Sequence, residues 1–377
     1  MSATRILAVL VKEFTQLVRD RLSYALILAM PVVQLLLFGY AINNDPHHLP
    51  TAVLVQDQGA LARSTLGALV RSDYFDITET ARTPEELDRA MALGRVQFTV
   101  TIPADFTRRV ARGDRAQILV EADAADPTAT GSAIAALSAL PQEALKHDLT
   151  GALAPRGGGA PPFEVVVHRR YNPEAISAYN IVPGLLGVIL SMTLVMMTAL
   201  GVTREYERGT METLLATPVK PIEVMIGKLA PYVLVGLIQT VVILVIARVL
   251  FDVPFSGGWA GRGALVTGIL LFIVGSLALG FLISTVARNQ LQAMQMSVFY
   301  IFPSLLLSGF MFPFRGMPDW AQALGSVIPV THFLRVVRGA MLKGLGFAEM
   351  WQSLAALTAF VLVVVLLAMA RYRTTLD

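Results

Sequence analysis

Runs of about 20 apolar residues are the strongest constraint on this chain, because a helix of that length spans the hydrocarbon core of a bilayer. Only 15% of the residues are charged and 55% are hydrophobic, whereas soluble globular proteins carry about a quarter charged residues. We therefore predict an α-helical polytopic membrane protein with six transmembrane helices. The predicted spans are residues 22–42, 179–202, 229–250, 263–287, 291–312 and 351–370.

The N-terminal segment has two interpretations. Residues 1–21 place basic and apolar side chains at helical spacing, which predicts an amphipathic helix on the cytoplasmic membrane surface. A basic start before an apolar run is also typical of a signal peptide. The run at 22–42 is longer than a signal-peptide core, and Tyr40-Ala41-Ile42 is not a small-x-small cleavage motif. We expect a retained first span with a cytoplasmic N-terminus.

Residues 43–178 have the composition of a folded polar domain. They hold most of the acidic residues, lack a span-length apolar run, and alternate helix and strand patterns. Thr83-Pro84 followed by two glutamates predicts a helix start, and Val96, Phe98 and Val100 alternate with polar residues as in a strand. The pattern predicts an α/β domain inserted between the first two spans. The adjacent His47 and His48 lack partners at metal-ligand spacing, so we interpret them as loop residues.

Charge distribution predicts the orientation. With both termini in the cytoplasm, most basic residues close to the spans fall inside, as the positive-inside rule requires. The α/β domain then faces the periplasm or cell exterior. Residues 313–346 contain Pro313, Pro318 and Pro329 within a semi-apolar stretch. We expect them to form short, partly re-entrant helices on the outer side.

Several activities are excluded by missing motifs. No G-x-x-x-x-G-K-[ST], H-E-x-x-H or G-x-S-x-G motif is present, and Gly227-Lys228 lacks the upstream glycine of an ATP-binding loop. There is no cysteine, and a net charge of +3 gives no support for nucleic-acid binding. The predicted spans carry almost no charge at their centres, which argues against an ion relay. Energy for any transport must therefore come from another polypeptide.

A polar stretch, Thr203–Lys228, separates the second and third spans and lies in the cytoplasm by this topology. Its charges surround a small apolar stripe of Met211, Leu214 and Leu215. Such a helix could lie along the bilayer and contact a cytoplasmic partner. Composition alone favours a solvated loop whose charges merely prevent insertion.

The stretch resembles the cytoplasmic segment of ABC-2 type permeases, the membrane subunits of bacterial ABC exporters, whose pattern is roughly E-x-E-x-G-T-x-E-x-L-L-x-T-P-x…E-x-x-x-G-K. The resemblance extends over essentially the whole chain, including Phe312-Pro313, Met317-Pro318 and Arg338-Gly339, although His332 stands where an aromatic is usual. The span layout is similar to that of the drug-efflux subgroup. The matching residues are Glu205, Glu207, Gly209, Thr210, Glu212, Leu214, Leu215, Thr217, Pro218, Glu223, Gly227 and Lys228.

The resemblance implies a permease subunit without catalytic residues, in the bacterial inner membrane. Two ATPase subunits would bind ATP and Mg²⁺ and pair with two permeases, either two copies of this chain or this chain and a paralogue. The implied cargo is a hydrophobic or amphipathic compound passed outward, and the implied further partners are a periplasmic adaptor and an outer-membrane channel. The coupling segment would comprise the matched residues together with Arg204 and Met211, with Thr210 able to cap its helix and Thr217-Pro218 ending it.

The substrate path is less constrained by the sequence. Met192, Met196, Met294 and Phe299 place soft and aromatic side chains in the second and fifth spans, which suits promiscuous apolar binding. The same residue types also face lipid or fill packing gaps. Three alternatives to drug export stay open: export of a lipid or polysaccharide, a receptor or sensor with an outer ligand-binding domain, and an ATP-independent carrier.

Overall fold

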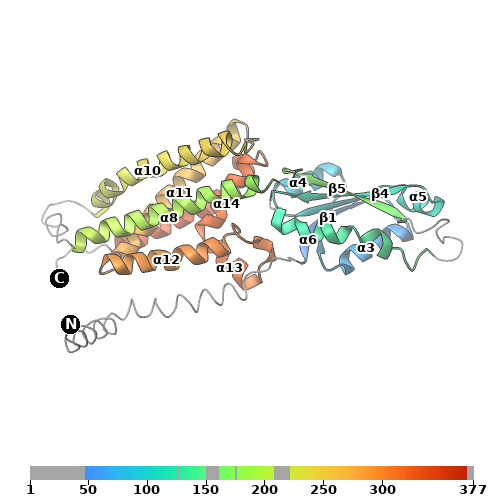
Figure 1. The fold of residues 1–377 in the computed structure, drawn as a ribbon, viewed down its shortest axis with the longest axis horizontal. Coiled ribbons are helices and arrows are strands. Elements are labelled where there is room, and N and C mark those ends of the chain that lie inside the picture. The colour runs from blue at the N-terminus through green and yellow to red at the C-terminus, as the bar shows by residue number, and fades with distance from the viewer. Residues whose placement is uncertain (1–46, 126, 150–160, 175, 208–220, 372–377) are drawn as a thin grey trace, which may run out of the picture.

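The computed structural model describes residues 47–125, 127–149, 161–174, 176–207 and 221–371. It contains an α/β domain followed by a bundle of long helices (Figure 1). We call the end of the bundle that contacts this domain the domain end, and the opposite end the distal end. The predicted surface helix at 1–21 and first span at 22–42 lie outside the described residues.

The α/β domain contains a five-stranded sheet in the order β2-β1-β3-β4-β5. Strands β1, β2 and β3 are parallel, β4 is antiparallel to β3, and β5 is parallel to β4. The elements in chain order are β1 (Leu49–Val55), α3 (Ala60–Arg71), β2 (Phe75–Thr80), α4 (Pro84–Ala92), β3 (Phe98–Ile102), α5 (Phe106–Arg112), β4 (Ala116–Asp123), α6 (Pro127–Leu137), α7 (Leu140–Glu143) and β5 (Phe163–Arg170).

Both faces of this sheet are covered. Helices α3, α5, α6 and α7 pack on one face, and α4 packs on the other against β1 and β3. The residues of strand β1 are buried on both faces of the sheet. Val53 belongs to the core on the first face, whereas Ala52 and Leu54 belong to the core with α4. A central strand buried on both sides needs apolar residues at consecutive positions, as β1 has. As its sequence predicts, α4 begins at the cap Thr83, whose hydroxyl accepts a hydrogen bond from the Glu86 amide at 3.4 Å.

The bundle confirms a helical membrane protein. Among the described residues, four helices are long and apolar enough to cross a bilayer: α8 (Ser177–Glu207), α10 (Pro221–Val249), α11 (Trp259–Val286) and α15 (Phe347–Arg371). They contain most of the predicted spans 179–202, 229–250, 263–287 and 351–370. The bundle is completed by α12 (Gln290–Leu307), η3 (Phe314–Gly316), α13 (Asp319–Val327) and α14 (Pro329–Met341).

Helix α12 occupies the predicted span 291–312 but is not one of the four apolar helices. Its first turns carry Gln290, Gln292 and Gln295, which lower its hydropathy. The helix also ends five residues before the prediction, because Ser308 caps it and Gly309 takes a left-handed φ of 81°. A glycine in that conformation commonly ends a helix. The stretch at 313–346 contains the short helices α13 and α14, and their depth in a bilayer stays a prediction.

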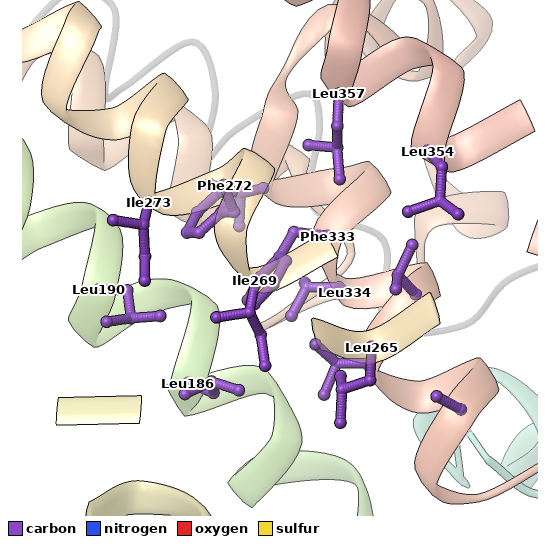
Figure 2. Close-up of a cluster of buried hydrophobic side chains, with 14 of the residues drawn as sticks. Leu186, Leu190, Leu265, Ile269, Phe272, Ile273, Phe333, Leu334, Leu354 and Leu357 are labelled. Atoms are coloured by element: carbon purple, nitrogen blue, oxygen red, sulfur yellow. The ribbon is translucent and has the colours of Figure 1, made fainter. Parts of the chain in front are cut away.

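Helix α11 lies at the centre of the bundle and packs against α8, α10, α12, α14 and α15. Figure 2 shows the core that it forms, with side chains from α8, α11, α14 and α15 converging. The rings of Phe272 and Phe333 stack with centroids 4.1 Å apart and planes within 7° of parallel. Burying large aromatic side chains contributes strongly to packing energy. This core therefore holds α14 firmly against the long helices.

Small residues let α8 and α11 approach closely. A Cβ atom on Gly280 would lie 2.6 Å from the Val195 carbonyl oxygen and 2.8 Å from the Thr198 Cβ. Close backbone approach through glycine is typical of helix pairs in membranes. Among the small residues of the predicted span 263–287, Gly280 is the one that makes this contact with α8.

The α/β domain docks directly on the domain end. Lys343 forms an ion pair with Asp123, and the two side chains are only 11% and 12% exposed. The Lys343 ammonium also lies 5.1 Å from the centroid of the Tyr171 ring. Ala125 and Tyr171 pack against the bundle core. The domain is thus joined to the bundle by buried contacts as well as by the covalent connection to α8.

Candidate functional site

The structure describes the two flanks of the predicted coupling segment 203–228. Helix α8 continues to Glu207, and α10 begins at Pro221, so both long helices extend into the stretch. Glu223, Gly227 and Lys228 lie in the first turns of α10. Arg204, Glu205 and Glu207 lie in the last turn of α8. The other predicted residues lie outside the described part of the chain: Gly209, Thr210, Met211, Glu212, Leu214, Leu215, Thr217 and Pro218.

The end of α8 is tied to the start of α12. One carboxylate oxygen of Glu207 accepts a hydrogen bond from the Gln290 backbone amide at 2.8 Å, and the other accepts one from the Gln290 side-chain amide. Arg204, one turn earlier, donates from Nε to the Gln290 Oε1 at 3.3 Å. We call this group of Arg204, Glu207 and Gln290 the clasp. It joins residues 83 and 86 positions apart in the sequence.

The α12 side of the clasp is held rigid by a cap. The Asn289 side chain accepts a hydrogen bond from the Gln292 amide at 2.8 Å, and the Gln292 side chain accepts one from the Arg288 amide at 2.9 Å. The first bond satisfies a backbone donor that a helix leaves open at its N-terminus, and the second ties the residue before the cap to the helix. The Glu207 carboxylate satisfies a further donor, and its negative charge suits the positive end of the α12 dipole.

These contacts also set the charge state of the clasp. The hydrogen bonds from the Gln290 side chain and backbone, together with the charge of Arg204, hold the pKa of Glu207 below its ordinary value. Glu207 is exposed, so the effect arises from these contacts rather than from burial. The carboxylate is therefore ionised throughout the neutral pH range.

The clasp gives the predicted segment a mechanical connection. The end of α8 that leads into this segment is joined to α12 by hydrogen bonds, and α8 is joined to α11 by the close contact at Gly280. Sequence analysis assigned Arg204 and Glu207 to the coupling segment, which stays a prediction, and it did not single out Gln290. The signal for α12 was present, because Asn289 followed three residues later by Gln292 is a helix-start pattern. The pairing with Glu207 was not predictable, since nothing local encodes it.

None of the four predicted substrate-path residues belongs to the buried contact between α8 and α12. Helices α8 and α12 pack through Val195, Ala199 and Ala293, with Met296 and Tyr300 at the edge of the contact. Met192 and Met294 are instead 51% and 46% exposed on the single chain. Met196 and Phe299 are half-buried. Small residues form the contact because they allow the closest approach of two helices. The assignment of these four residues to a path stays a prediction.

The histidines at the start of the α/β domain have ordinary structural partners. His47 and His48 lie 3.2 Å and 3.3 Å from the two carboxylate oxygens of Asp73, and His47 stacks on Tyr74. Within the described residues, no group of three or more His, Asp or Glu side chains could hold a metal ion.

Comparison with known proteins points to one family. The model of the ABC-2 family transporter proteins matches residues 22–370. The chain is 31% identical over 351 residues to the Escherichia coli K12 protein named probable multidrug ABC transporter permease YbhS, covering 91% of this chain and 90% of the relative. It is 26% identical to the protein named probable multidrug ABC transporter permease YbhR from the same organism, covering 91% of each chain.

Two further similarities extend the comparison. The Escherichia coli K12 protein named inner membrane transport permease YhhJ is 25% identical over 97% of this chain and 96% of its own length. A crystal structure of a domain of a putative ABC type-2 transporter from Thermotoga maritima aligns with 32% of this chain and 84% of that chain, at 16% identity and a TM-score of 0.25.

Proposed function

Because the chain belongs to the ABC-2 family of transporter permeases, we propose that it is the membrane subunit of an exporter for hydrophobic or amphipathic, drug-like compounds. The family makes it a permease subunit rather than an ATPase, so its transport depends on ATPase partner subunits. Those partners would bind the ATP and Mg²⁺. The observation that supports this class of transported compound is the full-length similarity to two probable multidrug permeases.

In the proposed orientation, the distal end of the bundle faces the cytoplasm and the α/β domain faces outward. The relative named as an inner membrane permease supports placement in the inner membrane. The clasp supports the orientation, because it lies at the distal end beside the segment that would meet the ATPase. Both termini would then be cytoplasmic.

The clasp suggests how ATP binding reaches the transmembrane helices. The ATPase subunits would engage residues 208–220 and the adjoining helix ends. Movement there would be passed by Glu207 and Gln290 to α12, and by the tight α8–α11 contact to the centre of the bundle. Closely packed helices move as rigid bodies rather than deforming gradually. The expected result is a switch of the bundle between inward- and outward-open arrangements.

A second permease, identical or paralogous, would complete the path. Helix α10 is mostly uncovered in the single chain, and Leu234, Ile238 and Val241 are 55% to 60% exposed. Lipid or the second permease would cover such apolar surface in the membrane. The outward α/β domain would contact the cargo or a periplasmic adaptor that leads to an outer-membrane channel.

The test is reconstitution of this permease with an ABC ATPase subunit. We expect co-purification, ATPase activity that a fluorescent amphipathic drug stimulates, and ATP-dependent movement of that drug in proteoliposomes. Movement of a lipid or polysaccharide instead would replace the cargo class while keeping the permease. Failure to bind any ATPase would favour a receptor or an ATP-independent carrier.

A charge reversal tests the coupling segment separately. Glu212→Lys should leave membrane insertion and assembly intact while abolishing drug-stimulated ATP hydrolysis. Glu174→Lys is the matched control, because Glu174 is an exposed carboxylate just after the α/β domain sheet. Full stimulated activity in Glu212→Lys would remove the coupling assignment.

A further inference from the structure

A cleft of 520 Å³ lies where the α/β domain meets the domain end of the bundle. The turn between α4 and β3 forms one wall, including Gly94 and Arg95. Segments η3, α14 and the start of α15 form the other. Clefts between domains are a preferred location for ligands, because two surfaces can contact one molecule. This cleft is distinct from the clasp, which lies at the opposite end of the bundle.

The cleft carries an excess of positive charge. Its two carboxylates are Asp123 and Glu349; Asp123 is paired with Lys343, and Glu349 accepts a hydrogen bond from the Gly346 amide at 2.9 Å. Five basic side chains line the same space: Arg95, Arg315, Arg335, Arg338 and Lys343. Of these, Arg95 is bound to Glu79 outside the cleft at 3.2 Å.

Arg315 and Arg335 have no carboxylate partner among the described residues. Arg315 donates from Nη2 to the Gly94 carbonyl at 2.7 Å, so it reaches across from η3 to the α/β domain. The Arg335 guanidinium lies 4.9 Å from the centroid of the Phe314 ring. Both interactions orient the guanidinium groups while leaving further N–H donors on each.

The two arginines also affect one another. Both arginines are exposed residues that line the cleft. Desolvation by neighbouring groups, followed by the like charge of Arg315, lowers the pKa of Arg335. Like charges held together in a partly desolvated site are unfavourable unless an anion joins them. Asp123 is the cleft carboxylate that acts on Arg315, but it is already paired with Lys343, so within the described part of the chain the two guanidinium groups have no carboxylate of their own.

The rest of the cleft is partly apolar. Phe314, Leu334, Leu345 and Met350 line it beside the arginines. A small inorganic ion would use only the guanidinium side. An amphiphile would place its anionic group on the arginines and its hydrocarbon on these side chains, which matches both kinds of surface.

We propose that this cleft binds the phosphate group of an anionic amphiphile through Arg315 and Arg335. Guanidinium groups suit this role because their planar N–H donors match phosphate oxygens in pairs. The bound molecule contacts the α/β domain and the bundle together, so its binding stabilises their docked arrangement. The shared chemistry is a phosphate ester, carried either by a bilayer lipid or by a soluble molecule that passes through the exporter.

The experiment measures binding to the full chain, purified in a neutral detergent and freed of anionic lipid. Thermal unfolding is followed with added phosphatidylglycerol, with phosphatidylcholine of the same acyl chains, and with glycerol phosphate. We expect an upward shift with phosphatidylglycerol that phosphatidylcholine does not produce. An equal shift with glycerol phosphate identifies a soluble phosphate ester as sufficient, whereas a shift with phosphatidylglycerol alone identifies a lipid.

Variants separate this site from general charge effects. Arg315→Gln and Arg335→Gln should each weaken binding about tenfold, or about 1.4 kcal/mol. Arg248→Gln is the matched control, because Arg248 lies at the same end of the bundle but pairs with Asp252 at 2.9 Å outside the cleft. Arg335→Lys keeps the charge and tests the paired donors if the glutamine variants unfold. The proposal fails if no anion shifts unfolding, or if the cleft variants and Arg248→Gln respond alike.

Discussion

Removing the Glu207 carboxylate should uncouple ATP hydrolysis from transport without unfolding the bundle. Glu207→Ala deletes two hydrogen bonds to Gln290 and a negative charge at the N-terminus of α12. A net hydrogen bond contributes about 0.5–1.5 kcal/mol, and a charge at a helix end about 0.3–1 kcal/mol. Because the site is exposed, we expect a total near the low end, about 1–2 kcal/mol. That energy changes the ratio of molecules with the Glu207–Gln290 contact formed to molecules with it broken by about 5- to 30-fold.

The assay is drug-stimulated ATPase activity and drug transport by the reconstituted complex. We expect Glu207→Ala to lower the drug transported per ATP by a factor within that range. Gln290→Ala should lower it by a similar factor, and the double variant should lose little more, because both substitutions break the same contact. Glu86→Ala is the control, since Glu86 accepts a hydrogen bond from the Arg82 amide at 2.7 Å wholly within the α/β domain.

The pH dependence provides an independent check. Because hydrogen bonding depresses the pKa of Glu207, its stabilising contribution is complete above the ordinary carboxyl pKa and disappears as pH falls through the lowered value. Coupling should therefore be unaffected by Glu207 titration between about pH 6 and 8.

Two results of the substitutions would refute a transmitting clasp. One is unchanged coupling in Glu207→Ala, and the other is a double variant whose loss of coupling equals the product of the two single losses.

Three further outcomes follow from the structure. Gly280→Val should separate α8 from α11 and reduce folded protein in membranes, measured by size-exclusion chromatography, because its Cβ would lie 2.6 Å from a backbone oxygen; Gly131→Val, with open space around it, is the control. Lys343→Met should destabilise the docked domain by about 3–5 kcal/mol, seen as faster proteolysis, because Asp123 stays buried without its partner. Asp57→Asn should lower the melting temperature. Burial raises the pKa of Asp57, but hydrogen bonds from Thr107 and Gly59 lower it by more, so the net pKa lies below the ordinary value. The carboxylate therefore stabilises the fold above the ordinary pKa, and this stabilisation is lost as pH falls through the lowered pKa.

Local sequence patterns predicted much of the fold because the relevant forces are local. Span-length apolar runs determine helices in a bilayer, where every backbone polar group must be bonded within the segment. The cap at Thr83 and the apolar residues of β1 likewise identify their elements directly. Helix ends were less predictable: α12 stops at Leu307 because of the backbone conformation of Gly309, and apolar residues continue beyond it.

The candidate site was likewise only partly predictable from the sequence. Arg204 and Glu207 were predicted as coupling residues from a linear motif, and that role stays a prediction. Their contact with Gln290 joins segments more than 80 residues apart and has no local signature. The path residues Met192 and Met294 were chosen by residue type, but the packing of small residues between α8 and α12 leaves both on the exposed surface.

The sequence by itself determined the class of the molecule: a helical membrane protein with a polar α/β domain. Hydrophobicity and local residue patterns establish this, because they do not depend on how the chain packs. Tertiary structure alone decided the contacts between distant segments. It joined Glu207 to Gln290 at one end of the bundle and placed Arg315 beside Arg335 at the other. Such juxtapositions arise from the packing of α8, α11 and α14 around a shared core, which no short stretch of residues encodes.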